Sequence, residues 1–190
     1  MLEIEQIDKD LQNILSPERY HHSKCTMDVC EELANIYGVD VETAKKVGLA
    51  HDIAKELTAE QALQYIDENN IQADEMEKRL TKLLHAKIGA DITKKKYGFT
   101  PEMGQAISEH TTGKENMTLL SKILYIADCT GIDRDFPDVN EVREMARNNI
   151  DEAMIMAFNI VIKESLKRKR EMHIDTILAR NWLIKNNSEG

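Results

Sequence analysis

Apolar residues recur along this chain at intervals of three and four, the spacing of one face of an α-helix. No segment shows the alternation of apolar and polar residues that a half-buried strand would need, and there is no internal repeat or linker. The pattern therefore predicts an all-α fold with about ten helices in a single domain covering 1–190. The expected helices are 2–15, 17–38, 41–52, 59–69, one or two within 74–97, 101–110, 119–128, one from about 141, one from about 150, and 175–185.

Capping residues mark where several of these helices begin. Ser16-Pro17 and Thr100-Pro101 each combine a favoured N-cap residue with a proline at the first helical position. Asp40 is the expected cap of the third helix. The segment from Thr58 to Gln61 reads as a capping box, in which each side chain bonds the backbone of the other residue.

Composition and charge narrow the classes of function. A chain of 190 residues with a net charge of −9 lacks the basic footprint of a protein that binds nucleic acid polymers. The basic run at 166–170 is interpreted as a solvated helix end. No apolar run is long enough to span a membrane, and the charged N-terminus does not resemble a secretory signal. Three cysteines without C-x-x-C spacing favour a reduced, cytoplasmic protein.

Six histidine and aspartate residues fall on segments expected to be buried helices. Any one of them alone is more often a core residue with a hydrogen-bond partner. Six together are difficult to bury without a shared cation. Mixed imidazole and carboxylate ligands suit iron, manganese, zinc or cobalt better than calcium or magnesium. The six are His22, His51, Asp52, His85, His110 and Asp128.

Helical spacing separates His22 from its neighbour His21. Steps of three and four from His22 reach Thr26, Val29 and Leu33, which places it on the apolar stripe. His21 is expected to lie nearer to solvent. Asp52 follows His51 directly on the expected helix. If that helix lies edge-on to the site, the two carboxylate oxygens of Asp52 could bridge two metal ions in a binuclear centre.

These residues and their flanking strings resemble a known family. Their order resembles the HD-domain metal-dependent phosphohydrolase superfamily in its two-metal form. The strings resemble the YqeK family over nearly the whole chain. That resemblance implies an HD-domain helical bundle, with a metal-binding core at about 18–135 and C-terminal helices 138–187 packed on it. The strings are RYHHS (19–23), GLAHDIAKEL (48–57), LLHAKIGA (83–90), AISEHTTGKENM (106–117), KILYIAD (122–128) and RDFP (134–137).

The resemblance also implies an activity and a role for each site residue. The implied reaction is symmetrical hydrolysis of diadenosine tetraphosphate to two ADP by a metal-bridging hydroxide, with iron as the first choice of metal. One ion would be held by His22, His51, Asp52 and Asp128, and the other by Asp52, His85 and His110. The implied catalytic residues are Asp52, Lys55 and Arg134, and the implied substrate contacts are Lys55, His85, Thr112, Gly113, Asp133 and Arg134. Thr112 would offer a hydroxyl group and Gly113 an exposed backbone N–H.

Several alternatives stay open at this point. Gly131-Ile132 stands where the family pattern often has Glu-Pro, so the preferred base and phosphate-chain length are not fixed. The same centre could act on a deoxynucleotide, guanosine tetraphosphate or a cyclic nucleotide. The chain could also be a helical binding protein with a vestigial metal site. A homodimer is possible by resemblance.

Overall fold

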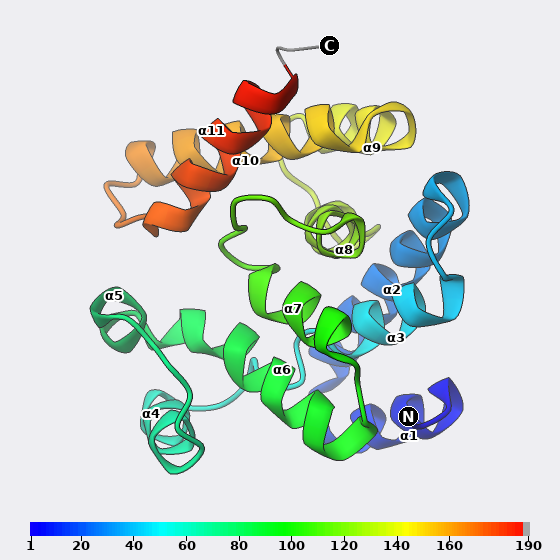
Figure 1. The fold of residues 1–190 in the computed structure, drawn as a ribbon, viewed down its shortest axis with the longest axis vertical. Coiled ribbons are helices and arrows are strands. Elements are labelled where there is room, and N and C mark those ends of the chain that lie inside the picture. Colours follow the sequence, from blue (N-terminus) through cyan, green and yellow to red (C-terminus); the bar gives the residue numbers. More distant parts are fainter. Residues whose placement is uncertain (188–190) are drawn as a thin grey trace.

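The computed structural model describes residues 1–187, and in that range it contains eleven α-helices, one short 3-10 helix and no strand (Figure 1). The predicted all-α fold is therefore confirmed. The elements in chain order are α1 (Ile4–Ile14), α2 (Pro17–Tyr37), α3 (Val41–Ala50), α4 (Ala59–Glu68), α5 (Glu75–Arg79), the 3-10 helix η1 (Thr81–Leu83), α6 (Leu84–Tyr97), α7 (Pro101–Glu109), α8 (Leu119–Thr130), α9 (Val139–Asn148), α10 (Ile150–Lys167) and α11 (Ile174–Asn187).

The predicted helix starts agree with the capping contacts in the structure. The side chains of Ser16, Asp40, Thr58 and Thr100 each accept a hydrogen bond from the backbone N–H three residues later. The capping box that begins at Thr58 is present in both directions. These bonds satisfy N–H groups that have no partner within the helix, which is why the boundaries could be read from the sequence.

The third helix ends earlier than the sequence predicts. α3 stops at Ala50, so His51 is its C-cap and Asp52 lies in the turn that follows. Nδ1 of His51 bonds the carbonyl of Gly48 at 2.8 Å, and the next backbone N–H groups bond carbonyls three residues back. The side chain of His51 thus binds a carbonyl at the helix end, and the chain turns tightly and carries Asp52 inward.

Helix α8 lies at the centre of the fold. It packs against α2, α3 and α7 on one side and against α9 and α10 on the other, where α10 also packs on α11. In Figure 1 the three C-terminal helices lie along one side of α8, while α4, α5 and α6 lie at the opposite end of the molecule. Leu120, Ile123, Leu124 and Ile126 of α8 are all buried in the main core. This burial fixes α8, which carries Asp128 near its C-terminal end.

A second, smaller apolar cluster holds α4 against α6. Ala62 and Ile66 of α4 pack there with Leu84 and Ile88 of α6. Because His85 follows Leu84 directly, this packing fixes the start of α6 that carries His85. Among the described helices, none is long and apolar enough to cross a membrane.

Candidate metal centre

The six predicted histidine and aspartate residues meet at the centre of the fold. They come from five places in the chain: α2, the end of α3, the start of α6, the end of α7 and the end of α8. The imidazoles are at most 4% exposed, and Asp52 is 1% exposed. His21, by contrast, is exposed, as its helical spacing predicted.

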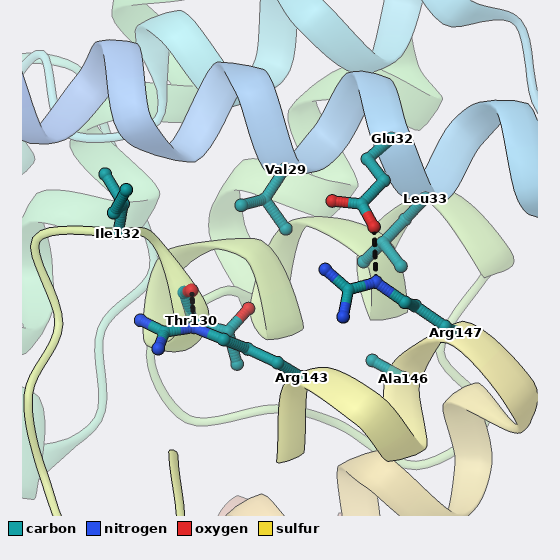
Figure 2. A pocket seen from close by; sticks show the side chains of 8 residues that line it. All are labelled: Val29, Glu32, Leu33, Thr130, Ile132, Arg143, Ala146 and Arg147. Atoms are coloured by element: carbon teal, nitrogen blue, oxygen red, sulfur yellow. Dashed lines mark hydrogen bonds and ion pairs between the residues drawn. The ribbon is translucent and has the colours of Figure 1, made fainter. Parts of the chain in front are cut away.

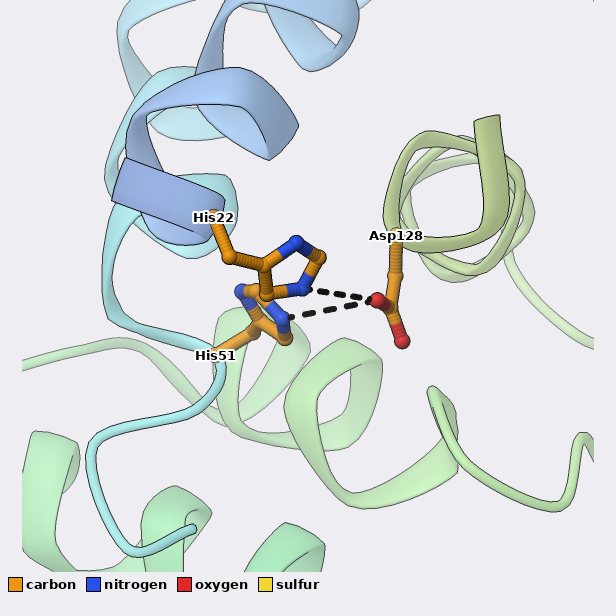
Figure 3. Close-up of side chains that lie close together, drawn as sticks. All are labelled: His22, His51 and Asp128. Carbon is orange, nitrogen blue, oxygen red and sulfur yellow. Dashed lines mark hydrogen bonds and ion pairs between the residues drawn. The ribbon is translucent and has the colours of Figure 1, made fainter. Parts of the chain in front are cut away.

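One group of possible ligands combines His22, His51 and Asp128. Oδ1 of Asp128 lies 3.0 Å from Nε2 of His22 and 3.9 Å from Nε2 of His51. Figure 3 shows both rings directed toward this carboxylate from separate elements. The three side chains thus present three donor atoms to one point.

A second group combines His51, Asp52 and His110, and His85 lies beside it. Oδ1 of Asp52 lies 3.2 Å from Nε2 of His85 and 3.5 Å from Nε2 of His110. Its other oxygen, Oδ2, lies 3.5 Å from Nε2 of His51 and 3.9 Å from Nε2 of His22. The carboxylate of Asp52 therefore faces both groups, one oxygen toward each.

Each of the four imidazoles is oriented through its Nδ1 atom. Nδ1 bonds a backbone carbonyl in three of them, with distances of 2.8 Å for His51 to Gly48, 2.6 Å for His85 to Lys82 and 2.6 Å for His110 to Ile107. In His22 the partner is Oδ2 of Asp133, at 2.8 Å. An imidazole whose Nδ1 donates its proton keeps a free lone pair on Nε2, which is the arrangement of a metal-binding histidine.

This donor set fits divalent metal ions. Nε2 of His51 and Oδ1 of Asp52 are buried and make no hydrogen bond. Buried polar atoms without a partner are costly and uncommon. Here they face other lone-pair donors a few ångströms away, so a cation between them would satisfy the whole set. Imidazole with carboxylate suits iron, manganese, cobalt or zinc.

Both aspartates of the centre are held in the charged form. Burial by itself would raise the pKa of Asp52, but the adjacent His51 and the imidazoles of His110 and His85 beside the carboxylate hold that pKa well below its usual range. Burial is likewise outweighed at Asp128, where His22 and the charge of His51 lower the pKa of the carboxyl. The centre therefore supplies two negative charges to a bound cation at neutral pH.

The histidines give the metal-free protein a predictable pH dependence. Burial, which outweighs the opposing effect of the nearby Asp52 carboxylate, lowers the pKa of His85 from 6.5 to about 4. Between these values the unfolded chain binds a proton that the folded chain does not, so stability is present above pH 6.5 and is lost as the pH falls toward 4. The expected loss from this residue is about 3 kcal/mol. Urea unfolding of chelator-treated wild type and His85→Gln across this pH range measures it, and identical pH slopes in the two proteins would contradict the assignment.

Three cations surround the centre. Nη1 of Arg19 lies 2.8 Å from Oδ2 of Asp52. Nζ of Lys55 lies 3.0 Å from Nε2 of His85 and 3.5 Å from Oδ1 of Asp52. Nη2 of Arg134 lies 2.5 Å from Oδ1 of Asp128 and 3.0 Å from Nε2 of His22. Lys55 and Arg134 thus lie at the metal centre, and their contacts with substrate remain a prediction.

Two residues at the centre were not predicted from the sequence. Arg19 stands one helical turn before His22 on α2, and that spacing was a usable signal. Thr111 directs its hydroxyl to Nε2 of both His85 and His110, at 3.2 and 3.3 Å. It follows the end of α7, where helical periodicity no longer indicates which side chain points inward.

The structure corrects the expectation for the turn after His110. Gly113 does not present an exposed N–H, because it is buried and this N–H donates to the carbonyl of Glu109 at 2.9 Å. The hydroxyl of Thr112 donates to the carbonyl of Gly113 at 3.1 Å. The backbone carbonyl of Thr112 accepts a bond from the hydroxyl of Thr176 on α11. The hydroxyl that reaches the centre from this turn belongs to Thr111.

A cleft of about 400 Å³ opens beside the centre. Arg19, Lys55, Lys82 and His85 line it together with apolar side chains of the segment from Ala54 to Ala62, and no acidic residue is part of its lining. In a protein of net charge −9, this cleft is a local cationic surface next to the two aspartates. Such a surface suits an anionic ligand such as a phosphate.

Known proteins share both this sequence and this fold. A model of the HD domain family matches residues 19–131. Proteins named symmetrical bis(5'-nucleosyl)-tetraphosphatase from Bacillus subtilis (strain 168) and Halalkalibacterium halodurans are 33% and 34% identical over 171 residues, covering 90% of this chain and 91% of each relative. A crystal structure of a "predicted HD superfamily hydrolase involved in NAD metabolism" from Clostridium acetobutylicum matches with a TM-score of 0.94 and 37% identity, covering 98% of this chain and 99% of the other. As the sequence motifs predicted, the chain belongs to the HD domain family and, within it, to the family of these symmetrical bis(5'-nucleosyl)-tetraphosphatases.

Proposed function

We propose that this protein hydrolyses diadenosine tetraphosphate symmetrically, giving two ADP, at a binuclear metal centre formed by the six histidine and aspartate residues. One observation carries the proposal: Asp52 directs one carboxylate oxygen toward each group of ligand atoms. A carboxylate in that position suits a pair of ions. The names of the relatives, which cover most of this chain, support the choice of substrate.

The chain's own residues divide the work between holding ions and holding substrate. His22, His51, Asp52 and Asp128 would hold one ion, and Asp52, His85 and His110 the other. When bound, two divalent ions would supply a water molecule of lowered pKa and positive charge beside the attacked phosphate. His85 and Asp52 also contact Lys55, which links the metal residues to the cationic cleft.

Lys55 and Arg134 are the proposed partners of the phosphate oxygens. Both already lie within hydrogen-bond distance of the metal residues, and both carry protons that a phosphate can accept. The planar guanidinium of Arg134 can bind two oxygens of one phosphate. Their charge would oppose the negative charge that develops on the attacked phosphate in the transition state. ADP leaves as an anion, so no covalent nucleophile from the chain is needed.

Asp133 takes a supporting part in this proposal. Its carboxylate accepts the Nδ1 proton of His22, which keeps Nε2 of that ring free to bind an ion. Gly131 allows this contact, because a side chain at that position would place its Cβ 2.5 Å from Oδ1 of Asp133. Glycine at position 131 therefore leaves the space that Asp133 occupies when it bonds His22. A direct contact from Asp133 to substrate remains a prediction.

Product analysis tests the proposed reaction. Iron-loaded protein is incubated anaerobically with diadenosine tetraphosphate, and the nucleotides are separated by chromatography. We expect ADP as the sole product. AMP with ATP would show attack on a different phosphorus and would contradict symmetrical cleavage. Absence of turnover with confirmed metal would contradict the substrate. The same assay with NAD, guanosine tetraphosphate, deoxynucleotides and cyclic nucleotides would then identify the alternative.

The metal, the domain organisation and the partners belong to the same proposal. Iron is the metal proposed first, with manganese, cobalt or zinc as alternatives that the ligand types also accept. We propose one domain, in which the core at about 18–135 binds the metals and the helices of 138–187 pack on it. Its partners are a dinucleoside polyphosphate or another nucleotide, in the cytoplasm.

A further inference from the structure

Arg143 lies on α9, outside the metal centre, yet its guanidinium binds the loop that reaches the centre. Nε donates to the carbonyl of Thr130 at 2.8 Å. Nη2 donates to the carbonyls of Gly131 and Arg134 at 2.7 and 3.0 Å. Nη1 donates to the side chain of Asn140 at 2.7 Å. One side chain therefore joins three carbonyls of the segment 130–134. This segment contains the last residue of α8 and the first part of the connection to α9, and we name it the α8–α9 loop.

The α8–α9 loop carries two residues that contact the proposed metal ligands. Asp133 accepts the proton on Nδ1 of His22, and Arg134 bonds both the carboxylate and the backbone carbonyl of Asp128. Both contacts require the loop backbone to stay within a fraction of an ångström of its position, because hydrogen bonds weaken steeply with distance and angle.

The loop has few other contacts to hold it. Ile132 at its tip is 85% exposed. Beyond Gly131, whose N–H bonds the carbonyl of Ala127 at the end of α8, the backbone bond within the segment runs from the N–H of Arg134 to the carbonyl of Gly131. The hollow between α2 and α9 shown in Figure 2, about 310 Å³, lies beside Ile132 and leaves that side of the loop without packing. Figure 2 shows the guanidinium of Arg143 next to Thr130, at the start of the loop.

We propose that Arg143 is a positioning residue for hydrolysis, acting through Asp133 and Arg134. Its bonds hold the loop carbonyls in one arrangement, and that arrangement keeps Asp133 on His22 and Arg134 on Asp128. A planar guanidinium with five donors can join three carbonyls at once, whereas the single ammonium of lysine cannot reproduce this geometry. The kinetic part of this inference rests on the proposed function, and the structural part does not.

The same helix offers a matched control. Arg147 stands one turn after Arg143 on α9, and its side chain is 52% exposed. Its Nε bonds Glu32 of α2 at 2.5 Å, and within the described part of the chain it makes no hydrogen bond to the α8–α9 loop. Arg147→Gln removes the same charge from the same helix and leaves the bonds of Arg143 to the loop in place (Figure 2).

Steady-state kinetics compare Arg143→Gln, Arg143→Lys and Arg147→Gln in metal-loaded protein. We expect kcat to fall about 10–100-fold in both Arg143 variants, the usual cost of losing a residue that orients a metal ligand, with a smaller change in KM. Arg147→Gln should stay within about twofold of wild type. In the Arg134→Ala background the Arg143→Gln change should cost less than it does alone, because one of its two routes of action is already removed. Losses that multiply, or full activity of Arg143→Gln, would overturn the proposal.

Hydrogen exchange keeps this test independent of the substrate. Amides of the α8–α9 loop should exchange at least about tenfold faster in Arg143→Gln than in wild type or Arg147→Gln, because local opening becomes easier. Unchanged exchange would overturn the proposal that Arg143 holds the loop, even in an active enzyme. Faster exchange in a protein that does not hydrolyse diadenosine tetraphosphate would support the role of Arg143 in holding the loop and would contradict only the proposed function.

Discussion

Asp52→Ala is expected to lower hydrolysis by about 10³-fold or more and to reduce metal binding in both groups of ligands. Its carboxylate approaches ligand atoms of both, with Oδ1 near His85 and His110 and Oδ2 near His51 and His22. Removing it withdraws a negative charge from both proposed ions. Metal ions of this kind contribute several kcal/mol to a reaction, and about 4 kcal/mol corresponds to about 10³-fold in rate.

Metal analysis with steady-state kinetics measures this effect. Asp91→Asn is the control, because Asp91 is an aspartate of α6 whose carboxylate bonds Tyr65 and Lys95, away from the six residues. Asp91→Asn should retain wild-type metal content and turnover. An Asp52→Ala protein that kept both metals and full turnover would contradict the bridging role of this carboxylate.

Gly113→Ala is expected to destabilise the protein by about 3 kcal/mol, the range typical of overpacking in a tight core. A Cβ at this position would lie 2.6 Å from Cζ and 2.8 Å from Cε1 of Phe158, whose ring is fully buried. The backbone at Gly113 also has φ of +71°, which an alanine adopts only with strain. Because this turn follows His110 and Thr111, any shift that relieves the clash would also move the centre.

Two other glycines separate strain from crowding in this test. Gly38 has φ of +70°, and no atom lies within 4 Å of the position that a Cβ would take, so Gly38→Ala should cost only about 1 kcal/mol. Gly104 lies within α7 with the same free space and no positive φ, so Gly104→Ala should stabilise by up to about 1 kcal/mol. Urea unfolding of the three variants measures these differences. A Gly113→Ala protein no less stable than Gly38→Ala would contradict the packing against Phe158.

The helices and the six central residues could be predicted because their signals are local. Helical periodicity placed His22 on a buried stripe, and capping chemistry marked Ser16, Thr58 and Thr100 as helix starts. The structure brings all six residues together. Periodicity was less useful where helices end, so the turn holding Asp52 and the inward direction of Thr111 were missed.

Contacts between distant segments were harder to predict. Arg143 bonds carbonyls nine to thirteen residues before it, and a backbone carbonyl leaves no mark in a sequence. Gly113 was expected to expose its N–H, but the return of the chain against α10 and α11 buries it beside Phe158 and Ala179. Such contacts depend on how helices pack across the domain, and only the three-dimensional structure supplies that information.

Anaerobic titration of metal-free protein with Fe²⁺, followed by hydrolysis of diadenosine tetraphosphate, tests the proposed binuclear centre most directly. We expect no turnover without metal, a rise that saturates at about two ions per chain, the number that a bridged pair of sites would hold, and ADP as the sole product. Full turnover by metal-free protein, or saturation at two ions in Asp52→Ala with wild-type rates, would contradict a metal centre bridged by Asp52.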